Sequence, residues 1–377
     1  MNHGFSSSPF HFLLAGGMTP LLELGFSALC GLLSMKNCQA VLDDAPAIRS
    51  LMNSTATPPV RIGVSSCLLG EQVRFDGGHK KDHFLVRELG QHVEWVSVCP
   101  ELEVGMGIPR EAVRLIRLAT NDDSHGLRMV GNKSGRDWTE DMLEFAKGRV
   151  KQLSRLDLSG YVLKSKSPSC GMERVSVYSA KGMPTKEGRG LFASVLMESL
   201  PFLPVEEEGR LNDPRLRENF IERVFAHHRW MLFRLERFTP ARLVEFHSRH
   251  KFLLLAHSVK HLRKLGRVVA GESRKRLTVE AADEYAGVFF EALSVLPTVK
   301  SHVNVLQHIA GFFKDRLDTG DKMELHNSID GYRRGVLPRL VPQTLILHHL
   351  RREKIAYIAD QVYLSPNPKE LVLKFHA

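Results

Sequence analysis

Three cysteines stand where predicted β-strands end, and their type and spacing point to metal chemistry. Cys67 follows the run VRIGVSS, Cys99 follows VEWVSV, and Cys170 follows GYVLKSKSPS. Because the carboxyl ends of parallel strands meet at one edge of a sheet, we expect these residues, 32 and 71 positions apart, to lie close together. Three thiolates without a fourth predict a metal centre with one open coordination position, which suits catalysis better than structural support.

The sequence pattern leaves the identity of the metal open. A structural zinc site would need a fourth protein ligand, usually in a CxxC-type pair, and the sequence has no such pair. A [4Fe–4S] cluster on three cysteines would leave one iron free to act as a Lewis acid toward a soft donor such as a thiocarbonyl sulfur. The spacing favours iron–sulfur over zinc without deciding between them. Cys30 and Cys38 are interpreted as small apolar core residues.

The elements that must position these cysteines form an α/β pattern from Val60 onward. The predicted elements are strands at 60–64, 94–98 and 160–164, helices at 83–90 and 139–156, a hairpin within 113–130, and a last helix that opens in 188–193. Each strand ends in a turn that bears Gly, Pro or Ser. We therefore predict an α/β N-terminal domain with a parallel sheet over residues 58–208.

Beyond the acidic run at 206–209 the strand signals vanish. Helical periodicity covers 214–237, 240–265, 278–296, 299–318, 321–335 and 342–358, with Pro or Gly at most junctions. This predicts an all-α C-terminal domain over residues 211–377. That half holds 28 of the 52 Lys and Arg residues but only 18 of the 42 Asp and Glu, so it contains the whole net charge of +10. The charge indicates capture of a polyanion, or a merely solvated basic surface, in equal measure.

Residues 1–57 read differently from the rest. Their apolar stretch is interrupted by Pro20, Glu23 and paired glycines, so it fits a membrane span poorly, and no basic residue precedes it as in a secretory signal. We expect a disordered tail, or a mis-assigned extension with translation starting at Met35 or Met52. Five cysteines in 377 residues do not make a disulfide scaffold, which favours a reducing compartment and hence the cytoplasm. No membrane association is expected.

Several segments of the first domain together resemble the thiouracil desulfidase family. They are SerSerCysLeuLeuGly at 65–70, ArgPheAspGlyGly at 74–78, ValCysProGlu at 98–101, LysSerProSerCysGly at 166–171 and GluGlyArgGlyLeuPheAla at 187–193. The resemblance implies an α/β domain with a [4Fe–4S] cluster on Cys67, Cys99 and Cys170. It also implies removal of sulfur from thiolated uracil without net redox, through sulfide bound to the free iron.

The second half resembles an uncharacterised helical domain that is often fused to the desulfidase domain. The segments are HisHisArgTrp at 227–230, PheHisSerArgHisLys at 246–251, AsnValLeuGlnHisIle at 304–309, TyrArgArgGly at 332–335 and TyrLeuSerProAsnPro at 363–368. Two-domain proteins of this kind resemble bacterial desulfidases that convert 4-thiouridine in tRNA to uridine. The resemblance implies tRNA as the partner; DNA is not expected.

Removing sulfur from a thiocarbonyl requires a group that moves protons, and Glu101 is the predicted acid or base, with a helix cap as the alternative. Ser167 and Ser169 are predicted to hydrogen-bond substrate or sulfide, or to cap the next element. Asp76 is predicted to orient a uracil edge, with an Asp-Gly turn as the alternative. Cations of the first domain are candidates for contacts with phosphate or with the cluster's charge: Arg74, Arg110 and Lys164.

Basic side chains of the helical half are predicted to hold tRNA phosphates. They are Arg249, Lys251, Arg263, Lys264, Arg267, Arg333 and Arg334. One alternative function is a desulfidase of free thiouracil or a thiouridine nucleotide, which would have no use for an extended basic surface. A second alternative is a non-catalytic, cluster-bearing sensor that binds nucleic acid; an open iron and Glu101 argue against it.

Overall fold

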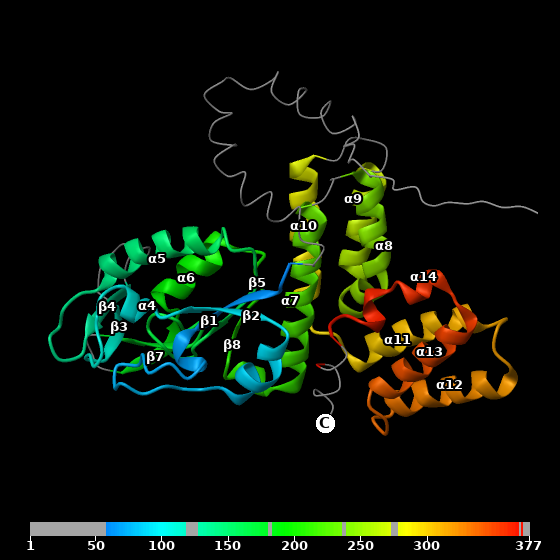
Figure 1. Ribbon diagram of the computed structural model, residues 1–377, viewed down its shortest axis with the longest axis horizontal. Helices are drawn as coiled ribbons and strands as arrows, with labels where there is room; N and C mark the ends of the chain where they lie inside the picture. Colours follow the sequence, from blue (N-terminus) through cyan, green and yellow to red (C-terminus); the bar gives the residue numbers. More distant parts are fainter. Residues whose placement is uncertain are drawn as a thin grey trace, which may run out of the picture. The chain divides into compact units, whose positions relative to one another are not determined.

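The computed structural model describes residues 58–117, 127–179, 183–235, 239–272, 278–368 and 371 (Figure 1). The chain divides into two compact units, residues 1–58 and 59–377. The expectations for residues 1–57, including those for Cys30 and Cys38, lie outside the described residues. Among the described helices, none has both the length and the apolar character that crossing a membrane demands.

Sheet A, in the order β2-β1-β5-β8, is parallel throughout, as predicted. Its strands are β1 (Arg61–Ser65), β2 (Glu94–Val98), β5 (Leu158–Leu163) and β8 (Val205–Glu207). Ser65 is paired with Val98, and Val64 with Val162, so the carboxyl ends of β1, β2 and β5 lie at one edge. Strand β8 falls within the acidic run that the sequence marked as a boundary.

Both faces of the two central strands of sheet A, β1 and β5, are buried, which explains why these strands are mostly apolar runs. Tyr161 and Leu163 of β5 join the core formed with α5 (Thr139–Leu153) and α6 (Leu191–Ser199), which lie side by side in Figure 1. Ile62 and Val162 face the opposite side and pack with α7 (Pro214–Leu235). The carboxyl edge is thus the part of the sheet left for a site.

Sheet B was only partly predicted. The expected hairpin is confirmed as antiparallel β3 (Val113–Arg117) and β4 (Leu127–Gly131). A second hairpin, β6 (Val175–Tyr178) and β7 (Pro184–Gly188), was missed because four of the five residues of β7 are exposed and show no apolar alternation. The predicted helix at 83–90 is instead a π-helical turn (Phe84–Glu88) followed by a 3-10 turn (Leu89–Gln91).

The C-terminal half is helical, as predicted. After α7 come α8 (Pro240–His257), α9 (Val259–Glu272), α10 (Val279–Ser294), α11 (Val299–Ala310), α12 (Thr319–Arg333), α13 (Leu340–Glu353) and α14 (Ala356–Ala359). The N-cap side chains of α8, α10, α11 and α12 each accept a backbone N–H from the first turn; they are Thr239, Thr278, Thr298 and Asp318.

Three predicted helices are broken in the structure. The helix expected over 299–318 ends as α11 at Ala310 and is followed by a 3-10 turn, Gly311–Phe313. The helix expected over 240–265 ends at His257, because Ser258 is extended and its hydroxyl accepts the backbone N–H of His261 at the start of α9. The helix expected over 342–358 ends where Lys354 adopts a left-handed conformation with φ 48°. Local hydrogen bonding by a serine competes with helix continuation, and periodicity alone does not register it.

The close approach of α7 to β5 depends on Gly160. A Cβ built on Gly160 would lie 2.6 Å from Val224 Cγ2 and 3.4 Å from the Pro204 carbonyl oxygen. Beside it, Ser159 Oγ and His228 Nδ1 are 3.3 Å apart. The missing side chain lets a helix of the second half seal one face of the sheet.

We expect Gly160→Ala to lower the free energy of unfolding by about 1–3 kcal/mol, because Val224 and the backbone must shift. Urea unfolding measures this change. Gly148→Ala in α5 is the matched control, since a Cβ there meets nothing within 4 Å, and it should stabilise the protein by about 0.5–1 kcal/mol. Equal effects of the two substitutions would contradict the close packing.

Candidate metal centre and active site

A cavity of about 310 Å³ lies at the carboxyl edge of sheet A, and all three predicted cysteines line it. Cys67 sits in the 3-10 turn that follows β1, Cys99 directly follows β2, and Cys170 lies in the loop after β5. All three are free thiols; Cys67 and Cys170 are buried and Cys99 is half-buried. The structure therefore places three sulfur donors from three segments around one cavity.

Burial controls the chemistry of these thiols. It raises the pKa of Cys67 to about 11, although the nearby Lys164 ammonium acts to lower this pKa. Burial also raises the pKa values of Cys99 and Cys170. Metal ligation requires thiolates, so a positive metal group would have to displace these protons. Three soft donors around one cavity fit a soft metal cofactor. Within the described ranges, no three His, Cys, Asp or Glu side chains are arranged to hold a single ion.

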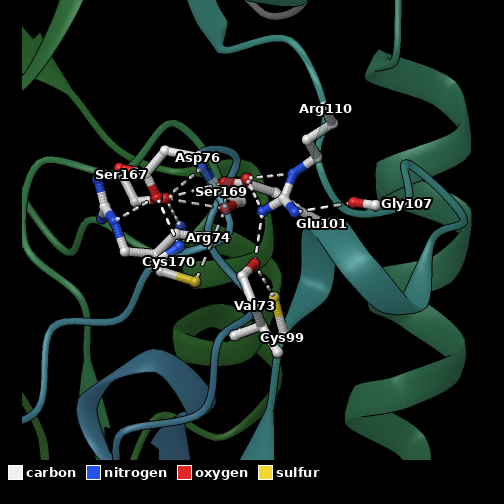
Figure 2. A network of polar contacts seen from close by, with 11 residues as sticks. Val73, Arg74, Asp76, Cys99, Glu101, Gly107, Arg110, Ser167, Ser169 and Cys170 are labelled. Carbon is white, nitrogen blue, oxygen red and sulfur yellow. Dashed lines mark hydrogen bonds and ion pairs between the residues drawn. The ribbon is translucent and has the colours of Figure 1, made fainter.

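Glu101 enters the same cavity from the first turn of α4 (Pro100–Glu103), where Pro100 fixes the helix start. Its Oε2 accepts hydrogen bonds from Arg110 Nη2 at 2.7 Å and from Arg110 Nε at 3.1 Å. Arg110 also donates to the carbonyls of Gly107 and Val73, each at 3.0 Å (Figure 2). With side chains 5% and 15% exposed, Arg110 and Glu101 form a buried, fully bonded ion pair.

The other oxygen of Glu101 faces the two serines (Figure 2). Ser169 Oγ donates to Glu101 Oε1 at 2.7 Å, and Ser167 Oγ lies 3.3 Å from the same oxygen and 2.9 Å from Ser169 Oγ. Ser169 Oγ is also 3.7 Å from Cys170 Sγ. Ser167 Oγ accepts the backbone N–H of Cys170 at 3.2 Å, so it shapes the turn as well. A carboxylate, two hydroxyls and a cysteine thus form one connected network.

Asp76 lies apart from this network. Its side chain is half exposed and does not belong to the cavity wall. The carboxylate accepts the Gly78 backbone N–H at 3.0 Å, and this hydrogen bond lowers the pKa of Asp76. The geometry is that of the Asp-Gly turn named as the alternative. Arg74, 3.6 Å away, does line the cavity.

The acidic run at 206–208 supports the site, a role that sequence reasoning missed. Glu208 pairs with Lys164 in the cavity wall, and its Oε2 accepts the Ser165 backbone N–H at 2.7 Å. Glu207 Oε1 accepts a hydrogen bond of 2.7 Å from the backbone N–H of Met172, in the loop that carries Cys170. Burial raises the pKa of Glu207. The position of these acids in the sequence could have revealed this role, because they directly follow Val205, the first residue of the parallel strand β8.

The rim of the cavity is cationic. Lys80 and Lys166 are exposed and line the opening together with Arg74 and the exposed ring of Phe75. Inside, the Arg110 and Lys164 charges are already neutralised by glutamates. Arg74 lies 3.6 Å from Asp76, so among the described residues of the cavity the unpaired cations are Lys80 and Lys166 at the mouth.

The predicted RNA-binding residues fall into two groups. Arg249 and Lys251 on α8 are exposed, as are Arg263, Lys264 and Arg267 on α9. Together with Lys260, the α9 residues have the spacing i, i+3, i+4, i+7 of one helix face, here called the α9 basic face. In the described part of the chain no acidic side chain pairs with this face. Arg333 and Arg334, by contrast, both pair with Asp330.

We expect Arg110→Met to destabilise the protein by about 3–5 kcal/mol, because it leaves the Glu101 carboxylate buried without its counter-charge. Adding Glu101→Gln should recover most of the loss, since a neutral amide tolerates burial better. The measurement is a double-mutant cycle, in which urea unfolding gives the free energy of unfolding of the wild type, the two single variants and the double variant. A double variant as unstable as Arg110→Met would show that Arg110 acts by packing instead.

Comparisons with known proteins match two separate parts of the chain. Residues 62–208 match the family described as 2-thiouracil desulfurase, and residues 251–368 match the family described as protein of unknown function DUF1722. The uncharacterised protein YbgA of Escherichia coli (strain K12) is 30% identical over 164 residues, 44% of this chain and 97% of YbgA. The uncharacterised protein YbbK of Bacillus subtilis (strain 168) is 32% identical over 152 residues, 40% of this chain and 97% of YbbK.

Among solved structures, the [4Fe-4S]-dependent thiouracil desulfidase TudS is 26% identical, with 43% of this chain and 99% of that chain covered and a TM-score of 0.34. The first family match covers residues 62–208. This range includes the three cysteines and Glu101, which line one cavity in the structure. Residues 62–208 thus make this chain a member of the 2-thiouracil desulfurase family, joined in one polypeptide to a DUF1722 domain.

Proposed function

We propose that the protein removes sulfur from 4-thiouridine in tRNA, giving uridine, with a [4Fe–4S] cluster held by Cys67, Cys99 and Cys170. The observation that supports it most is the single cavity, lined by three thiols and by the Glu101–Ser169 pair. Membership of the 2-thiouracil desulfurase family supports desulfidation of a thiolated uracil. A tRNA substrate would place the protein in the cytoplasm.

The three thiols fit the proposed cluster because they are the soft donors that iron–sulfur groups require, and all three line one cavity. When bound, the cluster supplies an iron without a protein ligand, a Lewis acid for the departing sulfur. Overall, water replaces sulfur: a carbon–oxygen bond forms, the carbon–sulfur bond breaks, and sulfide leaves without net transfer of electrons.

The chain's own groups handle the protons of this exchange. Arg110 pairs with Oε2 of Glu101 and leaves Oε1 directed at the serines, so Oε1 is the acceptor that we assign to the proton lost by the attacking water. Ser169, which donates to that oxygen, lies between it and Cys170 and orients the water or the substrate. The arrangement keeps base and sulfur ligand within one hydrogen-bonded network.

A nucleic acid substrate is supported by the distribution of charge. Lys80, Lys166 and Arg74 surround the mouth of the cavity, where the phosphates next to an inserted base would lie. The α9 basic face adds four cations without acidic partners in the described residues, and Arg249 and Lys251 extend it on α8. Arg333 and Arg334 share Asp330, so we assign them a smaller contribution.

The decisive experiment incubates anaerobically purified protein with tRNA that contains 4-thiouridine, and with free 4-thiouracil and 4-thiouridine monophosphate. Nucleoside analysis should show uridine replacing 4-thiouridine in tRNA at the highest kcat/KM. Turnover confined to the small compounds would favour the free-base or nucleotide alternative. Binding of tRNA without turnover of any substrate would favour the non-catalytic sensor.

We expect Glu101→Gln to abolish sulfide release, because an amide cannot accept the proton of the attacking water. Wild type and variant should both be brown and hold about four irons per chain, since the cysteines remain. Glu103→Gln is the matched control: Glu103 accepts the Cys99 N–H and pairs with Arg149, and it does not line the cavity. Full turnover by Glu101→Gln, or a colourless zinc-bound wild type, would contradict the assignment.

Replacing Lys260, Arg263, Lys264 and Arg267 with Gln should weaken tRNA binding and flatten its salt dependence. Each lost phosphate contact reduces the slope of log affinity against log salt by roughly 0.7–0.9. Fluorescence anisotropy over a salt series measures the slope, and iron content checks that the first domain is intact. Arg333→Gln/Arg334→Gln is the paired-cation control. An unchanged slope in the fourfold variant would remove the α9 basic face from the interface.

A further inference from the structure

The cavity that holds the three cysteines has an aromatic ring in its wall that the proposed chemistry does not use. Among the described residues that line the cavity, Phe75 is the only one with an aromatic side chain. Phe75 is 38% exposed, although phenylalanine is among the residues most often buried. An exposed ring in a cavity wall offers a surface on which a flat ligand can stack.

Phe75 also differs from the other exposed aromatic residues of the described chain. Those two, Phe312 and Tyr357, pack against each other with ring centroids 5.6 Å apart. No second ring packs against Phe75 in the described residues; instead the Arg74 guanidinium lies over it, with Cζ 5.3 Å from the ring centroid. This distance is typical of a cation–π contact, which orients the ring and leaves it available to another planar group.

The turn that carries Phe75 is held from two sides. Within the turn, the Arg74 N–H donates to the Gly78 carbonyl at 3.2 Å. From outside, the Arg110 backbone N–H donates to the Phe75 carbonyl at 3.0 Å. Because the side chain of Arg110 also pairs with Glu101, one residue fixes both the ring and the carboxylate. The Asp-Gly turn thus has a structural use at the site, which is to hold the ring in the cavity wall.

The size of the cavity makes a stacking surface useful. Its volume of about 310 Å³ lies at the lower end of the range for ligand pockets, roughly 300–1,000 Å³, so it suits one base and not a base pair. A base within an RNA must therefore leave its own stack before it can reach the cysteines, which costs free energy. Stacking on an aromatic side chain returns part of that cost, and extruded bases are commonly bound in this way.

We propose that Phe75 stacks on the pyrimidine ring of the thiolated uracil and so fixes the direction in which the thiocarbonyl sulfur enters the cavity. The inference rests on the proposed desulfidation and adds a substrate-binding residue to it. Phe75 acts on the base itself, whether the base is free or part of a nucleotide. Lys80 and Lys166, in contrast, can act only on substrates that carry phosphate.

The test compares the steady-state kinetics of anaerobically purified, full-length holoprotein with those of its Phe75→Leu variant. The substrates are free 4-thiouracil, 4-thiouridine monophosphate and tRNA that contains 4-thiouridine. KM should rise roughly five- to tenfold for each of them, because the stacking contact is lost. The value of kcat should stay within about twofold, since stacking is equal in the ground state and the transition state. For tRNA the rise in KM should be the same at every salt concentration, because no phosphate contact is lost.

Phe75→Tyr keeps the ring and should show the wild-type KM, which separates stacking from a change in loop structure. Iron content and the urea midpoint should be the same in the wild type and both variants. Phe312→Leu is the matched control, since it makes the same change at an exposed ring outside the cavity, and its kinetics should equal those of the wild type.

Three results would overturn the stacking role and leave the proposed desulfidation standing. They are a wild-type KM in Phe75→Leu, a Phe75→Tyr variant as impaired as Phe75→Leu, and a rise in KM that disappears at high salt. A wild-type protein that releases sulfide from none of the three substrates overturns the proposed function and this inference together.

Discussion

The parallel pairing of β1, β2 and β5 is the constraint on which the rest of the site depends. It brings the three segments that bear Cys67, Cys99 and Cys170 to the same edge. Because helices bury both faces of the sheet, this edge is where a ligand can reach the strand ends. A shift in the order or direction of these strands would separate the three sulfurs, whatever the local sequence around each cysteine.

Two ion pairs are the second feature that shapes the site. Glu101 is paired with Arg110 and Glu208 with Lys164, so two buried carboxylates and two buried cations coexist in or beside the cavity wall. These pairs are rigid because breaking either would leave an uncompensated charge away from water. Their fixed geometry directs one oxygen of Glu101 toward the serines and leaves Lys80 and Lys166 as the unpaired cations of the cavity among the described residues.

The two halves of the chain share α7. Its apolar face completes the core beneath β1 and β5, while other residues of the same helix border the cavities of the helical half. Gly160 permits this contact, and the Ser159–His228 pair adds a polar link. The part that matches the 2-thiouracil desulfurase family and the basic helical part thus form one compact unit over residues 59–377, which is compatible with the proposed tRNA substrate.

The sequence by itself determined the fold class, the main strands and helices, and the three cysteines, because apolar periodicity and turn residues are local signals that survive without coordinates. Only the tertiary structure decided that Arg110 forms an ion pair with Glu101 and that the run at 206–208 supports the site. It also decided that Asp76 closes a turn. Finally, it showed that Arg333 and Arg334 are paired, while in the described residues the α9 basic face is not. It also decided the break at Ser258 and the β6–β7 hairpin. The reason is physical: Glu101 and Arg110 are 9 positions apart and Lys164 and Glu208 are 44 apart, and no periodicity records which charges meet once the chain is folded.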